Sequence, residues 1–323
     1  MAGKGDGVGV AVMGCGHWGK NLVRNFSALG ALVAVVDPRA DVAAKFAKEY
    51  GVKALSLDEA LASEDISAVV IAVPAELHAK IALAAIAAGK DVYVEKPVAL
   101  TMEDASAIAD AASAADRILM VGHLLQYHPA FEALLGSVRA GDLGTIQYAY
   151  STRVSTGIFR TEENALWSLA PHDFSLMLAL FGEAPDHVEG TGAGWVTPGI
   201  EDEYRVNMTF PSGGRAHIFA SWLHPFKEQR LVVVGDKAMA VFEDTHPDKE
   251  QKLRLYRHGI DRNSGKPVPV KAEAEILPYD MAAEPLRQEC QHFLDCCASR
   301  ANPRTDAKEA LAVLQAMIMA GNS

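Results

Sequence analysis

The chain has little cysteine and no paired arrangement of it. Only four of its 323 residues are cysteine: Cys15, Cys290, Cys296 and Cys297. Three lie in the segment ECQHFLDCC, which lacks the C-x-x-C spacing of a zinc module, and the set is too small for a disulfide scaffold. His292 and Cys296 are four residues apart and could share a metal ion, but apolar residues recur there at helical spacing. We therefore expect a buried helix face, no metal site and a cytoplasmic location.

Long apolar runs and an excess of basic residues are also absent. No run approaches the roughly 18 residues that cross a bilayer. The first residues, MAGKGDG, lack an apolar core, which predicts no signal peptide. The net charge is −11 with acidic residues spread along the chain, whereas nucleic-acid binding requires a basic face. We expect neither a membrane nor a nucleic acid as a partner.

What is present is the composition of an ordinary globular protein, with 50% hydrophobic and 22% charged residues over a length typical of two domains. Up to about residue 122, short apolar runs alternate with helical patterns, which predicts an α/β domain with a parallel sheet over residues 1–122. From about residue 144, alternating patterns predict strands of a mainly antiparallel sheet, with one helix at 168–182. We assign 123–323 to this second domain, whose final helices, at 284–299 and 306–320, could pack back on the first.

A glycine-rich motif, G-x-G-x-x-G, follows the first predicted strand and opens the first predicted helix. Glycine triplets alone are weak evidence, but in this context they predict a turn that binds the diphosphate of a dinucleotide. The helix N-terminus adds unpaired N–H groups and a partial positive charge. We expect five of these residues to contact the cofactor: Gly14, Gly16, His17, Trp18 and Gly19.

An acidic residue, Asp37, ends the second predicted strand, eighteen residues after Gly19. A carboxylate there accepts hydrogen bonds from the ribose of NAD and repels the 2′-phosphate of NADP. The alternative is an aspartate that only caps the turn before Pro38. Arg39 weakens the preference, since an arginine can hold a phosphate. We predict NAD as the cofactor, with NADP less favoured.

The segment DVYVEKP places Glu95, Lys96 and Pro97 directly after an apolar strand. A surface turn is one reading. If the strand belongs to the parallel sheet, however, its carboxyl end faces the ligand crevice, and Lys96 lies there too. Desolvation would lower the pKa of such a lysine, and it could then exchange a proton with a substrate hydroxyl.

These motifs, together with AVP at 72–74 and PHD at 171–173, resemble the Gfo/Idh/MocA oxidoreductase family over about residues 8–315. The resemblance implies a Rossmann domain followed by an α/β domain with a large open, mainly antiparallel sheet that often forms the oligomer contact. It implies NAD(P)-dependent chemistry on a sugar or cyclitol hydroxyl, with Lys96 and His172 as catalytic residues. We add further expected cofactor contacts: Val73, Pro74, His78, Glu95, Lys96, His123 and Gln126. For His78, a position at the protein surface, away from the cofactor, agrees equally well with the sequence.

One position departs from the family pattern: Ser168 stands where many relatives carry an aspartate four residues before the histidine. This argues against an inositol or simple-sugar dehydrogenase. Several segments, among them CGHWGKNLVRNF and ENALWSLAPHD, resemble the branch that acts on UDP-N-acetylated sugars and their uronates. The segment 151–167, just before His172, supplies groups suited to a diphosphate, a carboxylate, an acetamido group or a sugar face. We expect the following residues to bind the substrate: Arg153, Arg160, Asn164, Trp167 and His172. A merely solvated loop is the alternative.

The sequence thus predicts an NAD-dependent oxidoreductase that acts on a secondary hydroxyl, at C3, of a UDP-N-acetylated sugar or its uronate. One alternative is a dehydrogenase of a free sugar or cyclitol, and another is a non-catalytic dinucleotide-sensing regulator. An exposed face of the second sheet would favour a homodimer or homotetramer.

Overall fold

The structure is a computed structural model that describes residues 7–157, 159–263 and 265–322. The chain divides into two compact units: unit 1 is the segment up to Leu124 together with Glu284–Leu314, and unit 2 is Leu125–Ala283 together with the segment after Leu314. The segment with the predicted helix 284–299, which could pack back on the first domain, lies in unit 1, so unit 2 is formed by two separate segments of the predicted domain 123–323.

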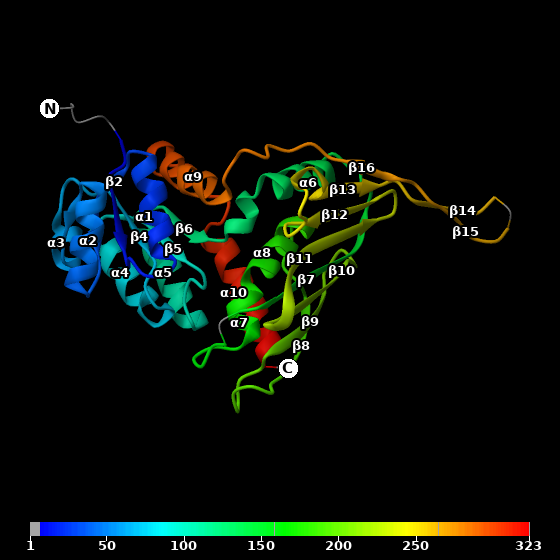
Figure 1. Cartoon of the computed structure of the whole chain (residues 1–323), viewed down its shortest axis with the longest axis horizontal. Coiled ribbons are helices and arrows are strands. Elements are labelled where there is room, and N and C mark those ends of the chain that lie inside the picture. Colours follow the sequence, from blue (N-terminus) through cyan, green and yellow to red (C-terminus); the bar gives the residue numbers. More distant parts are fainter. Residues whose placement is uncertain (1–6, 158, 264, 323) are drawn as a thin grey trace. The chain divides into compact units, whose positions relative to one another are not determined.

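Unit 1 contains a six-stranded parallel sheet in the order β3-β2-β1-β4-β5-β6 (Figure 1). Its strands are short and mostly apolar, and the central ones are buried along their whole length, as expected when helices cover both faces. The order reverses between β1 and β4, and ligands bind such sheets at the carboxyl ends of the strands beside this point. The strands are β1 (Val10–Met13), β2 (Leu32–Val36), β3 (Lys53–Ala54), β4 (Ala68–Ile71), β5 (Asp91–Glu95) and β6 (Leu119–Gly122).

The helices of unit 1 alternate with these strands. Thr101 caps α5 as its sequence predicts, because its hydroxyl accepts a hydrogen bond from the backbone N–H of Asp104 at 3.1 Å. The helices are α1 (Gly19–Ala28), α2 (Ala40–Tyr50), α3 (Leu57–Ala62), the 3₁₀ turn η1 (Ala75–Leu77), α4 (His78–Ala87), α5 (Met102–Ala114) and α9 (Pro285–Ser299). The last helix, α10 (Ala307–Gly321), begins in unit 1.

Helix α9 returns to unit 1 because its apolar stripe matches a surface there. The Phe293 ring meets Phe26 of α1 and Tyr93 of β5 edge-on, with ring centroids 6.3 and 5.7 Å apart. All four cysteines are free thiols and buried. Among the described residues no group of His, Cys, Asp and Glu is arranged to hold a metal ion.

Unit 2 is built on an eight-stranded sheet in the order β16-β13-β12-β11-β7-β10-β9-β8, in which only β7 and β10 pair in parallel. This confirms the predicted α/β fold class with a second, mainly antiparallel sheet. Its strands are β7 (Ile146–Thr156), β8 (His187–Ala193), β9 (Glu203–Thr209), β10 (Arg215–Ser221), β11 (Leu223–Gly235), β12 (Met239–Glu243), β13 (Leu253–Tyr256) and β16 (Ala274–Ile276).

Helices of unit 2 pack on one side of this sheet: α6 (Pro129–Arg139) on β12, α7 (Ala165–Leu169) on β9 and β10, and α8 (Pro171–Phe181) on β7. The predicted single helix over 168–182 is wrong. It is two helices that share Ala170 as their junction. Pro171 lacks a backbone N–H and cannot continue α7, but it is well suited to the first position of α8.

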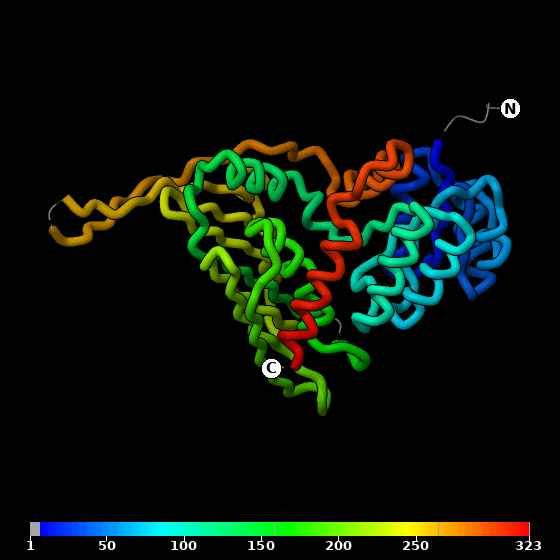
Figure 2. Tube along the Cα trace, turned by 180° about the vertical axis from the view of Figure 1, so that it is seen from behind, coloured from blue at the N-terminus to red at the C-terminus, as the bar shows by residue number. Residues whose placement is uncertain are grey.

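A narrow hairpin, β14 (Gly259–Asp261) and β15 (Val268–Val270), projects from the β13–β16 edge of the sheet of unit 2, as the tube in Figure 2 shows. Its apolar side chains are exposed, with Ile260 at 58%, Val268 at 46% and Val270 at 49%. In the described part of the chain, no helix has the length and apolarity that crossing a membrane requires.

Candidate cofactor and catalytic site

The glycine-rich turn has the backbone that its sequence predicts. Gly14 follows β1 with φ +93°, and a Cβ at this position would lie 2.5 Å from the carbonyl oxygen of Ala72. Around Gly16 nothing lies within 4 Å of an added Cβ, so a ligand can approach its backbone closely. A Cβ on Gly19 would lie 1.9 Å from the carbonyl oxygen of Gly14, so only glycine lets α1 begin against the turn.

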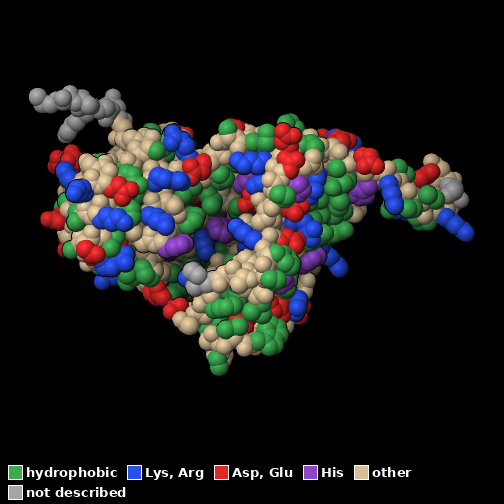
Figure 3. All heavy atoms as spheres, viewed as in Figure 1, with side chains coloured by type: hydrophobic (Ala, Val, Ile, Leu, Met, Phe, Trp, Pro, Cys, Tyr) green, Lys and Arg blue, Asp and Glu red, His purple; other side chains and the backbone are tan. Residues whose placement is uncertain are grey.

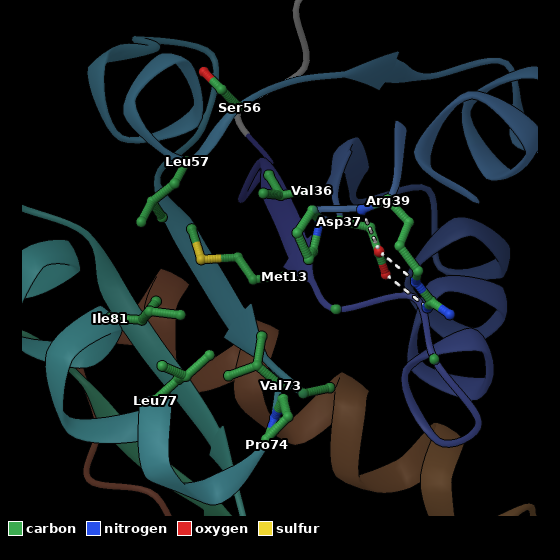
Figure 4. Close-up of a pocket in the computed structure, with 14 residues that line it drawn as sticks. Met13, Val36, Asp37, Arg39, Ser56, Leu57, Val73, Pro74, Leu77 and Ile81 are labelled. Carbon is green, nitrogen blue, oxygen red and sulfur yellow. Dashed lines mark hydrogen bonds and ion pairs between the residues drawn. The ribbon is translucent and has the colours of Figure 1, made fainter. Parts of the chain in front are cut away.

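This turn opens onto a cavity of about 700 Å³ at the carboxyl ends of β1, β2 and β4 (Figure 4). Six of the residues predicted to bind the cofactor line it: Gly14, Gly16, Asp37, Arg39, Val73 and Pro74. Figure 4 shows Val73 and Pro74 across the cavity from Arg39. The remaining wall is largely apolar, which suits the adenine half of a dinucleotide.

The sequence reasoning missed part of this wall, namely Met13, Val36, Pro38, Ser56, Leu57, Ala72, Leu77 and Ile81. For Ser56 a signal was available. The segment SLDE is a capping box in which the Ser56 hydroxyl accepts from the backbone N–H of Glu59 and the Glu59 carboxylate accepts from that of Ser56. It places the start of α3 at this edge of the sheet.

The Asp37 carboxylate lies in the cavity wall and is only 3% exposed. Its Oδ2 accepts a hydrogen bond from the backbone N–H of Cys15 at 2.9 Å, and its Oδ1 accepts from Nε of Arg39 at 3.1 Å. Burial disfavours the ionised carboxylate, but these hydrogen bonds outweigh it and hold the pKa of Asp37 below its usual value. Asp37 therefore stays negatively charged, with Arg39 folded back onto it.

The charged pair at the end of β5 has two different environments. Glu95 is buried and its Oε1 accepts a hydrogen bond from the indole Nε1–H of Trp18 at 2.5 Å. Burial raises the pKa of Glu95 to about 7, against the opposing effects of Trp18 and the charge of Lys96. Lys96 itself is half-buried in the turn after the strand.

Trp18 and Glu95 were both expected as cofactor contacts, and the structure instead directs their polar groups at each other. Neither these two residues nor His17 and Gly19 line the cavity. The side chain of His17 is exposed.

His78 lies behind the cavity and is buried, so a surface position for it is wrong. Its Nδ1 lies 2.7 Å from the carbonyl oxygen of Pro97 and its Nε2 lies 2.9 Å from that of Val73. Burial lowers the pKa of this imidazole. Both ring nitrogens thus face backbone carbonyl oxygens, and the neutral imidazole, which carries a single N–H, donates to one of them.

His123, at the end of β6, is 2% exposed with its Nε2 3.6 Å from Oε2 of Glu309. Burial, and then the positive charge of Lys96, lower the pKa of His123 to about 3. The His123 side chain is therefore neutral near pH 7. The positive charge of Lys96 lowers the pKa of both His123 and Glu95.

In unit 2, His172 is the second residue of α8 and half-buried. The next residue, Asp173, is buried and forms a two-point ion pair with Arg153 of β7, with Nε–Oδ2 at 2.5 Å and Nη2–Oδ1 at 3.2 Å. The prediction that Arg153 binds substrate is therefore revised. Its guanidinium fixes the first turn of α8, and with it the backbone that carries His172.

Two other predicted contacts are also used within unit 2. The Asn164 amide caps α7, accepting from the backbone N–H of Trp167 at 3.2 Å and donating to Glu201 at 2.7 Å. The buried amide of Gln126 donates to the Ser175 hydroxyl at 2.8 Å, which ties it to α8, and its contact with the cofactor stays a prediction. Arg160 and Trp167 keep exposed surface: Arg160 is 46% exposed beside Glu163, and Trp167 is half-buried.

The strand order of unit 1, the glycine-rich turn and the cavity together define a dinucleotide-binding protein. Residues 8–123 match the family described as oxidoreductase family, NAD-binding Rossmann fold, and residues 131–241 match the GFO/IDH/MocA C-terminal domain. The chain belongs to the Gfo/Idh/MocA oxidoreductase family, and it is a dehydrogenase that acts on CH–OH groups.

Its relatives differ in substrate. UDP-N-acetylglucosamine 3-dehydrogenase of Acidithiobacillus ferrooxidans is 29% identical over 293 residues, covering 89% of this chain and 88% of the relative. Inositol 2-dehydrogenase of Rhizobium meliloti is 30% identical over 256 residues, covering 73% and 76%. A solved structure of the Acidithiobacillus enzyme superposes with a TM-score of 0.85 at 27% identity, covering 96% of this chain and 95% of that one.

Proposed function

We propose that this protein is an NAD-dependent dehydrogenase that oxidises the C3 hydroxyl of a UDP-N-acetylated sugar or of its uronate. The observation that carries the proposal is the similarity to UDP-N-acetylglucosamine 3-dehydrogenase, which extends over the parts of the chain that form both units. Sequence segments on both sides of His172 resemble the same branch of the family. The regulator alternative is set aside, since the chain belongs to a family of dehydrogenases.

The cavity in unit 1 fits the adenosine and diphosphate of the cofactor. Gly14 and Gly16 leave the backbone accessible to the diphosphate, and the apolar wall suits the adenine. Asp37 favours NAD because a charged carboxylate accepts ribose hydroxyls and repels a 2′-phosphate. Arg39 is already paired with that carboxylate, which reduces its capacity to attract a phosphate.

Lys96 is the proposed acceptor of the hydroxyl proton, and His172 is its proposed partner or the group that positions the sugar. Bound NAD would supply the hydride acceptor. Lys96 lies close enough to Glu95 and His123 for its positive charge to lower the pKa of both, so it stands among buried ionisable groups at the end of the parallel sheet. Arg153 and Asp173 hold the start of α8, so that His172 is presented from a rigid helix end.

For substrate recognition we retain Arg160 and Trp167. An exposed guanidinium can pair with a diphosphate or a uronate carboxylate, and an indole can cover a sugar face. Arg153 and Asn164 are removed from this set, because their polar groups already have partners inside unit 2.

A cyclitol dehydrogenase is the second candidate, since inositol 2-dehydrogenase matches at a similar identity. Ser168, in place of the aspartate that many relatives carry, argues against it. The distinction rests on the substrate: UDP should compete with a nucleotide sugar and should not compete with an inositol.

A single-turnover experiment tests the proposal. Enzyme in excess is mixed with NAD and one of four substrates: UDP-N-acetylglucosamine, its uronate, UDP-glucose or myo-inositol. The absorbance of reduced nicotinamide in the near ultraviolet reports the reaction. A rise only with the N-acetylated UDP-sugars is expected, and a rise with myo-inositol alone would favour the second candidate.

We further propose that the protein is a homodimer or homotetramer, with a small molecule and not a membrane or a nucleic acid as its other partner. The strands of the unit 2 sheet carry exposed apolar side chains, Tyr148 at 42% and Phe226 at 55%, and the β14–β15 hairpin carries others. On the side of the molecule that Figure 3 shows, basic and acidic side chains are interspersed over unit 1. Light scattering in solution, which gives the mass of the particle, tests the proposed oligomer.

Four free thiols are compatible with a cytoplasmic location.

A further inference from the structure

The indole of Trp18 has an unusual position in the glycine-rich turn. Trp18 is the N-cap residue of α1, yet its side chain makes no capping hydrogen bond, and 39% of it is exposed. Tryptophan is a poor helix cap, and burial alone does not fix an indole that is this exposed. Its Nε1–H instead reaches the carboxylate of Glu95, 77 residues further along the chain, at 2.5 Å.

The surroundings of Glu95 hold its carboxylate in the position that accepts this hydrogen bond. A second donor, the hydroxyl of Tyr93, lies 3.3 Å from the same oxygen. Gly122 on the neighbouring strand leaves room for both groups, since a Cβ there would lie 2.6 Å from the Tyr93 hydroxyl and 3.0 Å from Oε2 of Glu95. Glu95 is 9% exposed and Tyr93 is fully buried, so this carboxylate has a defined position.

Apart from Tyr93, the ionisable groups around Glu95 come from two places, the turn after β5 and helix α9. Lys96 follows Glu95 in the turn after β5, and the positive charge of Lys96 favours the ionised form of the Glu95 carboxylate. Glu289 and Cys290 of α9 are buried on the other side, where the negative charge of Glu95 raises the pKa of each beyond the effect of burial. Among the residues that the structure describes, the negative form of Glu95 is supported by hydrogen bonds from Trp18 and Tyr93 and by the charge and backbone N–H of Lys96.

We propose that Glu95 is a positioning residue, and that its hydrogen bond with Trp18 couples the glycine-rich turn, which holds the diphosphate, to the turn that carries Lys96. The proposal rests on the proposed role of Lys96 in proton transfer. Its physical basis is that two turns from opposite halves of the sheet, one after β1 and one after β5, share a single buried carboxylate. If cofactor binding moves Trp18, the hydrogen bond between Trp18 and Glu95 would then change the position of the neighbouring Lys96.

The first test needs no substrate. In the full-length protein, the indole N–H resonance of Trp18, identified by its loss in Trp18→Phe, should titrate with a midpoint near pH 7 and should lose that titration in Glu95→Gln. Addition of NAD should shift the same resonance. Trp195→Phe, which removes a 69% exposed indole, is the matched control and should leave the Trp18 signal unchanged. A Trp18 resonance that Glu95→Gln leaves unchanged would overturn the proposal, whatever the substrate proves to be.

The second test is a double-mutant cycle on turnover. Trp18→Phe and Glu95→Gln should each lower kcat by roughly 10- to 100-fold, the factor expected for losing a hydrogen bond to a charged group, with a smaller effect on KM for the sugar. The acid limb of the pH profile should shift upward in Trp18→Phe. The double variant should match Glu95→Gln within about twofold, because Trp18 acts through Glu95. If the losses of kcat in the two single variants multiply in the double variant, the coupling between Trp18 and Glu95 is refuted. A normal Trp18 titration without turnover on any sugar would leave the link supported and refute the proposed function.

Discussion

The ion pair between Arg153 and Asp173 allows a quantitative prediction for Asp173→Asn. This change keeps the shape of the side chain and removes the charge that neutralises Arg153. The side chains of Arg153 and Asp173 are 9% and 3% exposed, so water cannot take over the role of the carboxylate. The guanidinium would remain buried beside β7 and lose the negative charge opposite it, together with one of its two hydrogen bonds to Asp173, because the asparagine amide keeps a single acceptor oxygen.

Breaking a buried ion pair from one side typically lowers the free energy of unfolding by about 3–5 kcal/mol. For a folding unit of 150–250 residues, each kcal/mol corresponds to about 2–4 °C in Tm. Asp173→Asn should therefore lower the Tm of unit 2 by about 6–20 °C. Because Asp173 fixes the first turn of α8, kcat at a permissive temperature should fall as well, through the neighbouring His172.

Differential scanning calorimetry of the full-length protein measures this change. Asp65→Asn is the matched control, because it removes the carboxylate of an exposed pair with Lys53, at 48% and 59% exposure, and should cost less than about 1 kcal/mol. Arg153→Met with Asp173→Leu replaces both partners by apolar groups and should recover most of the lost stability. A Tm within 3 °C of the unmodified protein for Asp173→Asn, or a double variant as unstable as the single one, would refute this reasoning.

Three further predictions concern unit 1. Lys96→Met should retain NAD binding and lower turnover by at least about a hundredfold, the usual scale of acid–base catalysis, and near-normal turnover would exclude Lys96 as the proton acceptor. Asp37→Ala should relax the discrimination against NADP measured by cofactor titration, and tighter NADP than NAD binding in the unmodified protein would contradict the preference. Glu289→Gln should make stability less dependent on pH. Burial first, and then Glu95, raise the folded-state pKa of Glu289, so the unmodified protein loses stability above pH 4.5, by up to about 1.4 kcal/mol per pH unit from this residue. Denaturant titrations at pH 5 and pH 8 measure this, and an unchanged difference between them would refute it.

Part of the candidate site could be predicted because its signals are local. Gly14, Gly16 and Gly19 have a spacing that only a strand–turn–helix uses in this way, and Asp37 follows the next strand at the expected interval. The cap of α7 was also readable, since Asn164 precedes an apolar helical segment, but we assigned its amide to substrate. Competition between a structural and a binding role for one amide is not visible in sequence.

Other residues could not be assigned without the fold. Arg153 and Asp173 are 20 residues apart, and an arginine near a predicted active site looks the same whether it pairs with a buried acid or with substrate. His78 gave no indication that both its nitrogens would meet carbonyl oxygens of other segments. In each case a long-range neighbour decided the role.

The sequence by itself determined the alternation of strands and helices in unit 1, the dinucleotide-binding turn and the family, because hydrophobic periodicity and turn chemistry act over a few residues. Tertiary structure decided which polar groups remain available to ligands. A buried side chain must satisfy its hydrogen bonds and charge with whatever packing brings to it. That is why Trp18 bonds to Glu95, why Arg153 bonds to Asp173, and why α9 belongs to unit 1.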